Sequence, residues 1–179
     1  MDVTEVVMLT PDDWRKFKEL RLAALAEASY AFGSTLAREQ SLSESDWRRR
    51  LARRAQFVVG VDGRPVGTAA GIASPDGDSA DLISMWVDPG WRGRGLADLL
   101  VREVLRWAAG QGLGEVRLWV ADGNRRAERL YLRHGFVATG QRQPVLPEDP
   151  TRWEFGMVRR LDRRERSSEG GGSHRAPPP

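Results

Sequence analysis

Hydrophobic positions recur along the chain with two different periods, and these periods divide it into helices and strands. Apolar residues return every three or four positions, as in a helix that packs by one face, in residues 11–28, 43–55, 96–110 and 124–134. Short apolar or alternating stretches bounded by turn residues, which are typical of strands, are residues 3–9, 56–61, 65–72, 80–87, 115–120, 136–141 and 153–161. This order predicts an α/β fold, or an α+β fold with a mixed sheet, in which the second to fourth strands form an antiparallel meander.

Cap residues indicate where the helices begin. Thr10 and Pro11 suit the start of the first helix, because threonine is a good cap and proline fits the first helical turn. Ser43 followed three residues later by Asp46 has capping-box spacing for the second helix. Residues 29–42 show no clear period, so we expect an irregular loop there, on the substrate side of the protein.

A loop rich in glycine and arginine, residues 87–97, joins a predicted strand to a predicted helix. Glycine lets successive backbone N–H groups point into one small volume, and the start of the helix adds unpaired amides and the positive end of its dipole. Phosphate groups bind to donors arranged in this way. The same segment is compatible with an ordinary strand-to-helix turn, and the loop by itself leaves both interpretations open.

Two sequence blocks together resemble the GCN5-related N-acetyltransferase (GNAT) family. Arg92-Gly93-Arg94-Gly95-Leu96-Ala97 matches the acyl-CoA pyrophosphate loop of that family. Residues 124–136 match a later helix in which an asparagine, an alanine, a Leu-Tyr pair and a Gly-Phe pair recur. The resemblance covers most of residues 3–161 and is weakest at 29–55 and 141–151, where such enzymes build their acceptor pockets.

The resemblance implies a GNAT fold, with a central mixed β-sheet of about seven strands flanked by helices, in one domain over residues 1–161. It implies an enzyme that transfers the acetyl group of acetyl-CoA to a primary amine of a small molecule or peptide, by direct attack in a ternary complex and without a metal. Family members are often dimers, so a homodimer is a further expectation. Residues 162–179 are polar and end in prolines, so we expect a disordered tail.

The cofactor contacts follow from the resemblance, position by position. In the family, the end of the fourth strand leaves its neighbour and its backbone binds pantetheine, while the loop amides bind the pyrophosphate. The cofactor-binding residues implied in this way are Met85, Trp86, Val87, Arg92, Gly93, Arg94, Gly95, Leu96, Ala97, Asn124, Ala127 and Tyr131. Asn124 has a second interpretation as a helix cap, and the strand residues have one as ordinary core.

Proton transfer selects the catalytic candidates. The departing thiolate needs a proton, which the phenol of Tyr131 can donate, although this ring is also suited to the core. The attacking amine must lose a proton, and Asp81 on the fourth strand is the first candidate for the base. Glu154 on the last strand is the second, and both carboxylates are compatible with a plain strand-edge charge. His134 lies at a helix end, where a histidine is favourable for the helix dipole alone.

Composition excludes several other kinds of site. The chain has no cysteine, which excludes disulfides, thiolate zinc sites and cysteine nucleophiles and suits a reducing cytoplasm. The formal net charge is +3, and no basic stripe is interleaved with aromatic residues, so we expect no nucleic-acid partner. No apolar run approaches the roughly 18 residues of a spanning helix, so we expect no membrane partner.

Two other classes of protein are compatible with part of the pattern. A dinucleotide-binding oxidoreductase also uses a glycine-rich loop, but here no such loop follows the first strand and no acidic residue stands at a strand end about 20 residues later. A non-catalytic acyl-CoA sensor or regulatory module fits the loop equally well, and only Tyr131 argues against it. No motif identifies the amine acceptor, although Trp47, Trp91 and Trp153 are candidates for its pocket as well as for the core.

Overall fold

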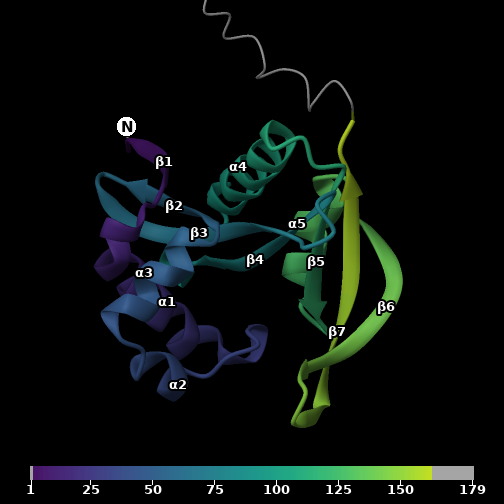
Figure 1. The fold of residues 1–179 in the computed structure, drawn as a ribbon, viewed down its shortest axis with the longest axis horizontal. Helices are drawn as coiled ribbons and strands as arrows, with labels where there is room; N and C mark the ends of the chain where they lie inside the picture. The colour runs from purple at the N-terminus through teal and green to yellow at the C-terminus, as the bar shows by residue number, and fades with distance from the viewer. Residues whose placement is uncertain (1, 163–179) are drawn as a thin grey trace, which may run out of the picture.

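Seven strands form one mixed sheet in the order β1-β2-β3-β4-β5-β7-β6 (Figure 1). The computed structural model describes residues 2–162, so the predicted tail from residue 163 onward lies outside the described residues. The strands are β1 (Thr4–Met8), β2 (Ala55–Val61), β3 (Arg64–Ala73), β4 (Ser79–Val87), β5 (Glu115–Ala121), β6 (Val137–Leu146) and β7 (Asp149–Arg160). Within these residues only β4 and β5 pair in parallel. The predicted mixed sheet of about seven strands is confirmed.

The helices cover both faces of the N-terminal half of the sheet. They are α1 (Trp14–Ala28), α2 (Leu36–Gln40), α3 (Glu44–Ala52), α4 (Leu96–Gly110) and α5 (Arg125–Arg133), with 3-10 turns η1 (Pro11–Asp13), η2 (Ser29–Ala31) and η3 (Pro89–Trp91). The group α1 to α3 lies on one face and α4 on the other (Figure 1). Successive residues of β2 divide between the two cores: Val58 packs in the α1 and α3 cluster, and Val59 in the α4 cluster. No helix within residues 2–162 is long and apolar enough to cross a membrane.

The helix starts agree with the sequence prediction, and two other segments do not. Ser43 and Asp46 form the predicted capping box of α3. Residues 29–42, expected to be irregular, contain η2 and the one-turn helix α2, which is too short to show a period. The strands predicted at 136–141 and 153–161 are too short, because β6 and β7 continue toward each other as a long hairpin. Most of the side chains of β6 are exposed, so no apolar alternation marks its length.

β4 and β5 diverge soon after they begin. Their parallel pairing covers three residue pairs, from Ser79 with Glu115 to Asp81 with Arg117, and the rest of β4 has no β5 partner. Ser84 has a φ of 58°, in the left-handed region that is uncommon for a residue with a side chain, and the β3–β4 register shifts at the same place. Such an irregularity bends a strand. The sheet therefore opens between the far ends of β4 and β5.

β6 forms one edge of the sheet, with β7 as its strand neighbour. Its pairing is irregular between Ala138 and Arg142 and again between Pro144 and Leu146. Gly140, inside the first irregularity, has a φ of 81°. Seven of the ten residues of β6 are exposed. This edge strand is therefore mostly exposed to solvent, and its pairing with β7 is interrupted at two places.

Candidate active site

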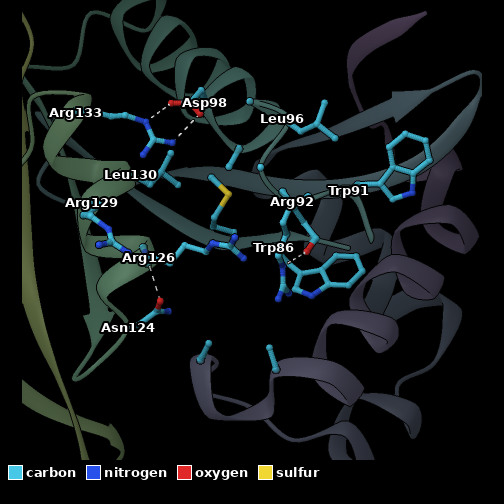
Figure 2. A pocket seen from close by; sticks show the side chains of 18 of the residues that line it. Trp86, Trp91, Arg92, Leu96, Asp98, Asn124, Arg126, Arg129, Leu130 and Arg133 are labelled. Carbon is cyan, nitrogen blue, oxygen red and sulfur yellow. Dashed lines mark hydrogen bonds and ion pairs between the residues drawn. The ribbon is translucent and has the colours of Figure 1, made fainter. Parts of the chain in front are cut away.

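Two neighbouring cavities lie where the sheet opens. The first, which we call the loop cavity, has a volume of about 470 Å³ and lies between the glycine-rich loop, α5 and the η2 turn (Figure 2). The second, the sheet cavity, has a volume of about 610 Å³ and lies between β4 and β5 on one side and residues of the α1 to α3 region on the other. Five residues line both cavities: Ala31, Phe32, Met85, Asn124 and Ala127. The two cavities therefore meet at the gap between β4 and β5.

The glycine-rich loop contributes backbone to the loop cavity. Gly93 and Gly95 have φ values of 82° and 79°, which residues with side chains rarely adopt, and Gly95 is the N-cap of α4. The amide of Leu99 donates to the Gly95 carbonyl at 3.3 Å, and the N–H groups ahead of it in the first turn have no intrahelical acceptor. Open space surrounds both glycines, as close approach of an anion to the backbone requires.

Arg92 holds this loop in place with its side chain. Its Nε donates to the Val87 carbonyl at 2.8 Å, and its Nη2 pairs with a Glu27 carboxylate oxygen at 2.6 Å. The Trp86 Nε1 donates to the same oxygen at 2.9 Å. The hydrogen bond from Arg92, assisted by that from Trp86, holds the pKa of Glu27 below its ordinary value against the opposing effect of burial. One carboxylate thus joins the loop and the end of β4 to α1.

α5 brings arginines to the opposite wall of the loop cavity (Figure 2). Asn124 Oδ1 accepts a hydrogen bond from the Ala127 amide at 3.2 Å, which confirms the cap interpretation of Asn124. Arg126, Arg129 and Arg133 all line the cavity. The sequence analysis did not single out these arginines, and their i, i+3, i+7 spacing on a predicted helix was the available signal. Guanidinium groups in this position suit a polyphosphate.

Asp98 also lines the loop cavity, and its negative charge is balanced. Arg133 donates Nε and Nη2 to its two oxygens at 2.7 and 2.8 Å, and His134 Nε2 lies 2.8 Å from Oδ1. The hydrogen bond from Arg133, with a further one from His134, lowers the pKa of Asp98 to about 2 although burial opposes ionisation. The ionised carboxylate joins α4 to α5. His134 is therefore engaged in this pair, apart from the sheet cavity.

The candidates for proton transfer all line the sheet cavity. Asp81 accepts a hydrogen bond from Ser74 Oγ at 3.1 Å. Glu154 accepts one from Gln143 Nε2 at 2.7 Å, and burial nevertheless raises the pKa of Glu154. Tyr131 is buried with its ring edge-on to Phe136, with 5.7 Å between ring centres, and burial raises the pKa of its phenol. Three residues far apart in sequence are thus brought to one cavity, as the hypothesis requires.

Ten of the twelve predicted cofactor-binding residues line the loop cavity, and two do not. The ten are Met85, Trp86, Val87, Arg92, Gly93, Gly95, Leu96, Ala97, Asn124 and Ala127. The side chain of Arg94 turns outward, with its guanidinium 4.6 Å from the centre of the Trp91 ring and 54% of the side chain exposed. Tyr131 belongs to the sheet cavity. Arg94 can therefore serve the loop only through its backbone.

An arginine cluster that the sequence analysis missed lines the helical side of the sheet cavity. We use this name for Arg21, Arg50 and Arg54 together with the carboxylate among them, Glu39. Arg21 donates two hydrogen bonds of 2.9 Å to the two oxygens of Glu39, and Arg50 donates a third of 2.9 Å. These residues come from α1, α2, α3 and the turn after α3, so no local pattern joins them.

The three candidate tryptophans have different surroundings. Trp47 is fully buried against Phe17, with 5.5 Å between ring centres, so it belongs to the core. Trp91 lines the loop cavity, and Trp153 is 41% exposed and lines neither cavity. Trp119, which the sequence analysis did not select, lines the sheet cavity. The acceptor-pocket hypothesis for Trp47, Trp91 and Trp153 therefore does not agree with the lining of the sheet cavity.

A mixed seven-stranded sheet that opens between two parallel strands beside a glycine-rich loop is the fold of an acetyltransferase. The chain belongs to the acetyltransferase (GNAT) family, whose family model matches residues 17–136. It is 40% identical over 90 residues to an uncharacterized N-acetyltransferase of Mycobacterium tuberculosis (strain ATCC 25618 / H37Rv). That match covers 50% of this chain and 57% of the relative, so the chain spans little more than half the length of the curated relative.

Solved structures agree with the fold. An acetyltransferase of the GNAT family from Streptococcus pneumoniae superposes with a TM-score of 0.73 at 20% identity, over 89% of this chain and 100% of that one. The PaiA N-acetyltransferase of Thermoplasma acidophilum, solved in complex with coenzyme A, superposes with a TM-score of 0.68 at 16% identity, over 89% of this chain and 99% of that one. At these identities the likeness concerns the fold.

Proposed function

We propose that this protein is an N-acetyltransferase that transfers the acetyl group of acetyl-CoA to an amine, by direct attack in a ternary complex. The observation that carries the proposal is the meeting of two cavities at the gap between β4 and β5. One is lined by backbone amides and guanidinium groups, which suit a pyrophosphate, and the other by two carboxylates and a phenol, which are chemically able to transfer protons. When bound, acetyl-CoA supplies an acyl group activated as a thioester.

The residues of the loop cavity fit that donor. The open space at Gly93 and Gly95 leaves room for phosphate oxygens beside the amides of the first turn of α4. Arg126 and Arg129 are exposed cations on the facing wall and have no ion pair among the described residues, whereas Arg133 is paired with Asp98. Two guanidinium groups therefore remain for the phosphates.

The unpaired end of β4 supplies backbone donors beside the reacting centre. Because β5 leaves β4 after Asp81, the backbone around Met85 has no β5 partner. In this proposal that backbone holds the pantetheine arm, and one N–H faces the thioester carbonyl, where negative charge develops during attack. A fixed donor at that position stabilises the transition state more than the ground state.

Glu154 and Tyr131 divide the proton transfers in this proposal. Glu154 is the better supported base, because burial raises its pKa and a carboxylate of raised pKa accepts a proton more readily. Asp81, the first choice from sequence, faces the same cavity and attracts the ammonium form of the acceptor. Tyr131 keeps its proton at neutral pH, because burial raises the pKa of the phenol, so it is available to donate to the leaving sulfur.

Release of free coenzyme A tests the proposed function. Acetyl-CoA is incubated with the protein and a panel of primary amines, and the thiol formed is followed with a chromogenic disulfide. We expect release that depends on both amine and protein. Tight binding of acetyl-CoA in calorimetry without release on any amine would instead favour the alternative, a non-catalytic acyl-CoA-binding sensor or regulatory module.

A further inference from the structure

The arginine cluster of the sheet cavity contains more positive than negative charge. Burial favours protonation of Glu39, but the hydrogen bonds and charge of Arg21, a hydrogen bond from Ser34 and the charge of Arg50 prevail and hold its pKa below the ordinary value. Glu39 is 1% exposed and is therefore a buried anion. The single negative charge of Glu39 is shared between the guanidinium groups of Arg21 and Arg50. One of these two positive charges is therefore not compensated inside the cluster.

Arg54 adds a third cation without a carboxylate partner among the described residues. Its Nε donates to the Arg50 carbonyl at 3.2 Å, and its guanidinium lies 5.7 Å from the centre of the Phe17 ring. Burial first, and then repulsion from Arg50 and Arg21, lower the pKa of Arg54 to about 10. The charge of Glu39 opposes this effect only in part. A partly buried guanidinium held against two others is costly unless a further anion compensates it.

The cluster also has a donor left open. Arg21 Nη1 is buried and has no hydrogen-bond partner among the described residues. Arg21 and Arg54 both line the sheet cavity, and the exposed Arg38 lies at the same wall. The guanidinium of Arg21 lies 4.7 Å from the centre of the Phe32 ring, and that of Arg50 lies 5.2 Å from the centre of the Trp47 ring. These contacts restrain both groups. Donors restrained in this way suit a planar, bidentate anion.

The opposite wall of the same cavity has the reverse charge. Asp81 and Glu154 lie on the sheet side, near Tyr131 and the residues shared with the loop cavity. An ammonium group is favoured at the carboxylates, and an anion is favoured at the arginines. The cavity is therefore complementary to a molecule that carries both charges, with its amine toward the reacting centre.

We propose that the acceptor amine of this protein also carries a carboxylate, which the arginine cluster binds at the helical end of the sheet cavity. This inference rests on the proposed function and names the substrate class of the same site. An amino acid and a short peptide with a free carboxylate share the required chemistry. Polyamines and aminoglycosides lack it, because they would bring further positive charge to Arg21 and Arg54.

The first test compares acceptors that differ only at the carboxylate. The panel contains amino acids, short peptides, and the carboxamide of each, with alkyl diamines as cationic controls. Coenzyme A release is measured on each, and binding of each to the coenzyme A-saturated protein is measured by calorimetry. We expect the best acceptor to exceed its carboxamide by roughly tenfold or more in kcat/KM and in affinity, because the amide leaves buried donors unpaired.

The two readouts separate this inference from the proposed function. A carboxylate preference in binding without coenzyme A release supports the arginine cluster as a carboxylate site and overturns the acetyltransferase proposal. Release with equal or better activity on carboxamides or diamines supports the acetyltransferase and overturns the carboxylate inference. Absence of any carboxylate preference in binding overturns it as well. Preference for free amino acids over peptides, or the reverse, then identifies the source of the carboxylate.

The second test removes the charge of Arg54 and keeps most of its volume. In Arg54→Met we expect the carboxylate preference to fall by roughly tenfold or more, mainly through KM, with a melting temperature equal to or above that of the wild type, since a poorly compensated cation is gone. Arg54→Lys keeps the charge and should retain part of the preference. Arg49→Met is the matched control, because Arg49 is 58% exposed, pairs with Asp46 and lines neither cavity. An unchanged preference in Arg54→Met would overturn the inference.

Discussion

The loop cavity and the sheet cavity share five lining residues, yet backbone groups dominate the binding surface of the first and side chains that of the second. The loop cavity depends on backbone amides at the start of one helix, with glycines whose conformation other residues rarely adopt. The sheet cavity depends on side chains from many separated regions of the chain, from Arg21 to Glu154. A backbone site is selective for a common group such as pyrophosphate, and a side-chain site can change its ligand by single substitutions. The contrast explains how one family fold can combine a constant donor with different acceptors.

The largest expected effect is on the backbone site. Gly95→Glu should abolish measurable coenzyme A binding, since it puts a carboxylate at the helix start where the phosphates bind, and like charges repel there. Isothermal calorimetry with coenzyme A measures the loss, and circular dichroism checks the fold. Gly77→Glu is the control, because Gly77 has nearly the same φ, 76°, with open space around it, in the turn between β3 and β4. Equal affinity losses in the two variants would remove the loop from cofactor binding.

The next effect separates chemistry from packing at Tyr131 in the sheet cavity. Tyr131→Phe should keep the ring contact with Phe136 and lower kcat by roughly 10²-fold to 10⁴-fold, the usual range for a lost general acid. Coenzyme A affinity should change little, because Tyr131 does not line the loop cavity. If turnover stays near wild type while the free energy of unfolding falls by about 1 kcal/mol, Tyr131 is a core aromatic and water or substrate donates the proton.

A smaller effect distinguishes the two carboxylates of the sheet cavity. Glu154→Gln should lower kcat/KM by roughly 10²-fold and flatten the acid limb of its pH profile. The base acts deprotonated, and burial raises the pKa of Glu154, so wild-type activity should fall with decreasing pH at a pH above the usual range for glutamate. Asp81→Asn should raise KM and leave that limb in place. The opposite result would restore Asp81, the first choice from sequence, as the base.

Gln143, which donates a hydrogen bond to Glu154, provides a second test of whether Glu154 is the base. Gln143 donates a hydrogen bond to the carboxylate and thereby opposes the rise in pKa that burial causes. Gln143→Ala should therefore move the acid limb of kcat/KM to higher pH, with the plateau rate changed less than in Glu154→Gln. An acid limb that does not move in Gln143→Ala would assign it to another group.

The smallest effect concerns stability at the wall of the loop cavity. Asp98 has its pKa lowered to about 2, mainly by Arg133, so its pairing stabilises the fold above the unfolded pKa near 4, and this contribution is lost as pH falls through about 2. Asp98→Asn should lower the free energy of unfolding at pH 7 by about 1 to 3 kcal/mol. The difference from wild type should disappear near pH 2 in thermal unfolding followed by circular dichroism. A difference that is constant with pH would show a packing effect.

The sequence was sufficient to predict the residues of the glycine-rich loop that line the loop cavity, because these residues are neighbours along the chain. The run from Arg92 to Ala97 is contiguous, and its glycines have a backbone meaning that follows from their missing side chain. The opening of the sheet was expected from the family resemblance alone, since Ser84 adopts a left-handed conformation that its residue type does not indicate. The hydrophobic periodicity likewise predicted the long helices. It missed α2, because a helix of five residues is too short to show a period.

The sheet cavity could not be predicted in the same way. Arg21 and Glu39 are 18 positions apart, and their two hydrogen bonds exist only because α1 and α2 pack side by side. Tyr131 was found through the family resemblance, whereas its burial beside Phe136 appears only in the folded chain. Arg94 shows the opposite error, since a residue within a matched motif turns its side chain away and stacks on Trp91. Motif position therefore predicts backbone roles better than side-chain roles.

The irregular pairing of the edge strand β6 affects how this protein behaves at high concentration. An edge strand exposes unpaired N–H and C=O groups that can recruit a strand from another molecule, and repeated recruitment leads to aggregation. Pro144 has no N–H to offer, and Arg142 would bring like charges together if two such edges met. Gly140 lies at an interruption in the pairing, so the edge is not a flat template. The irregular strand thus protects the folded chain against open-ended sheet growth.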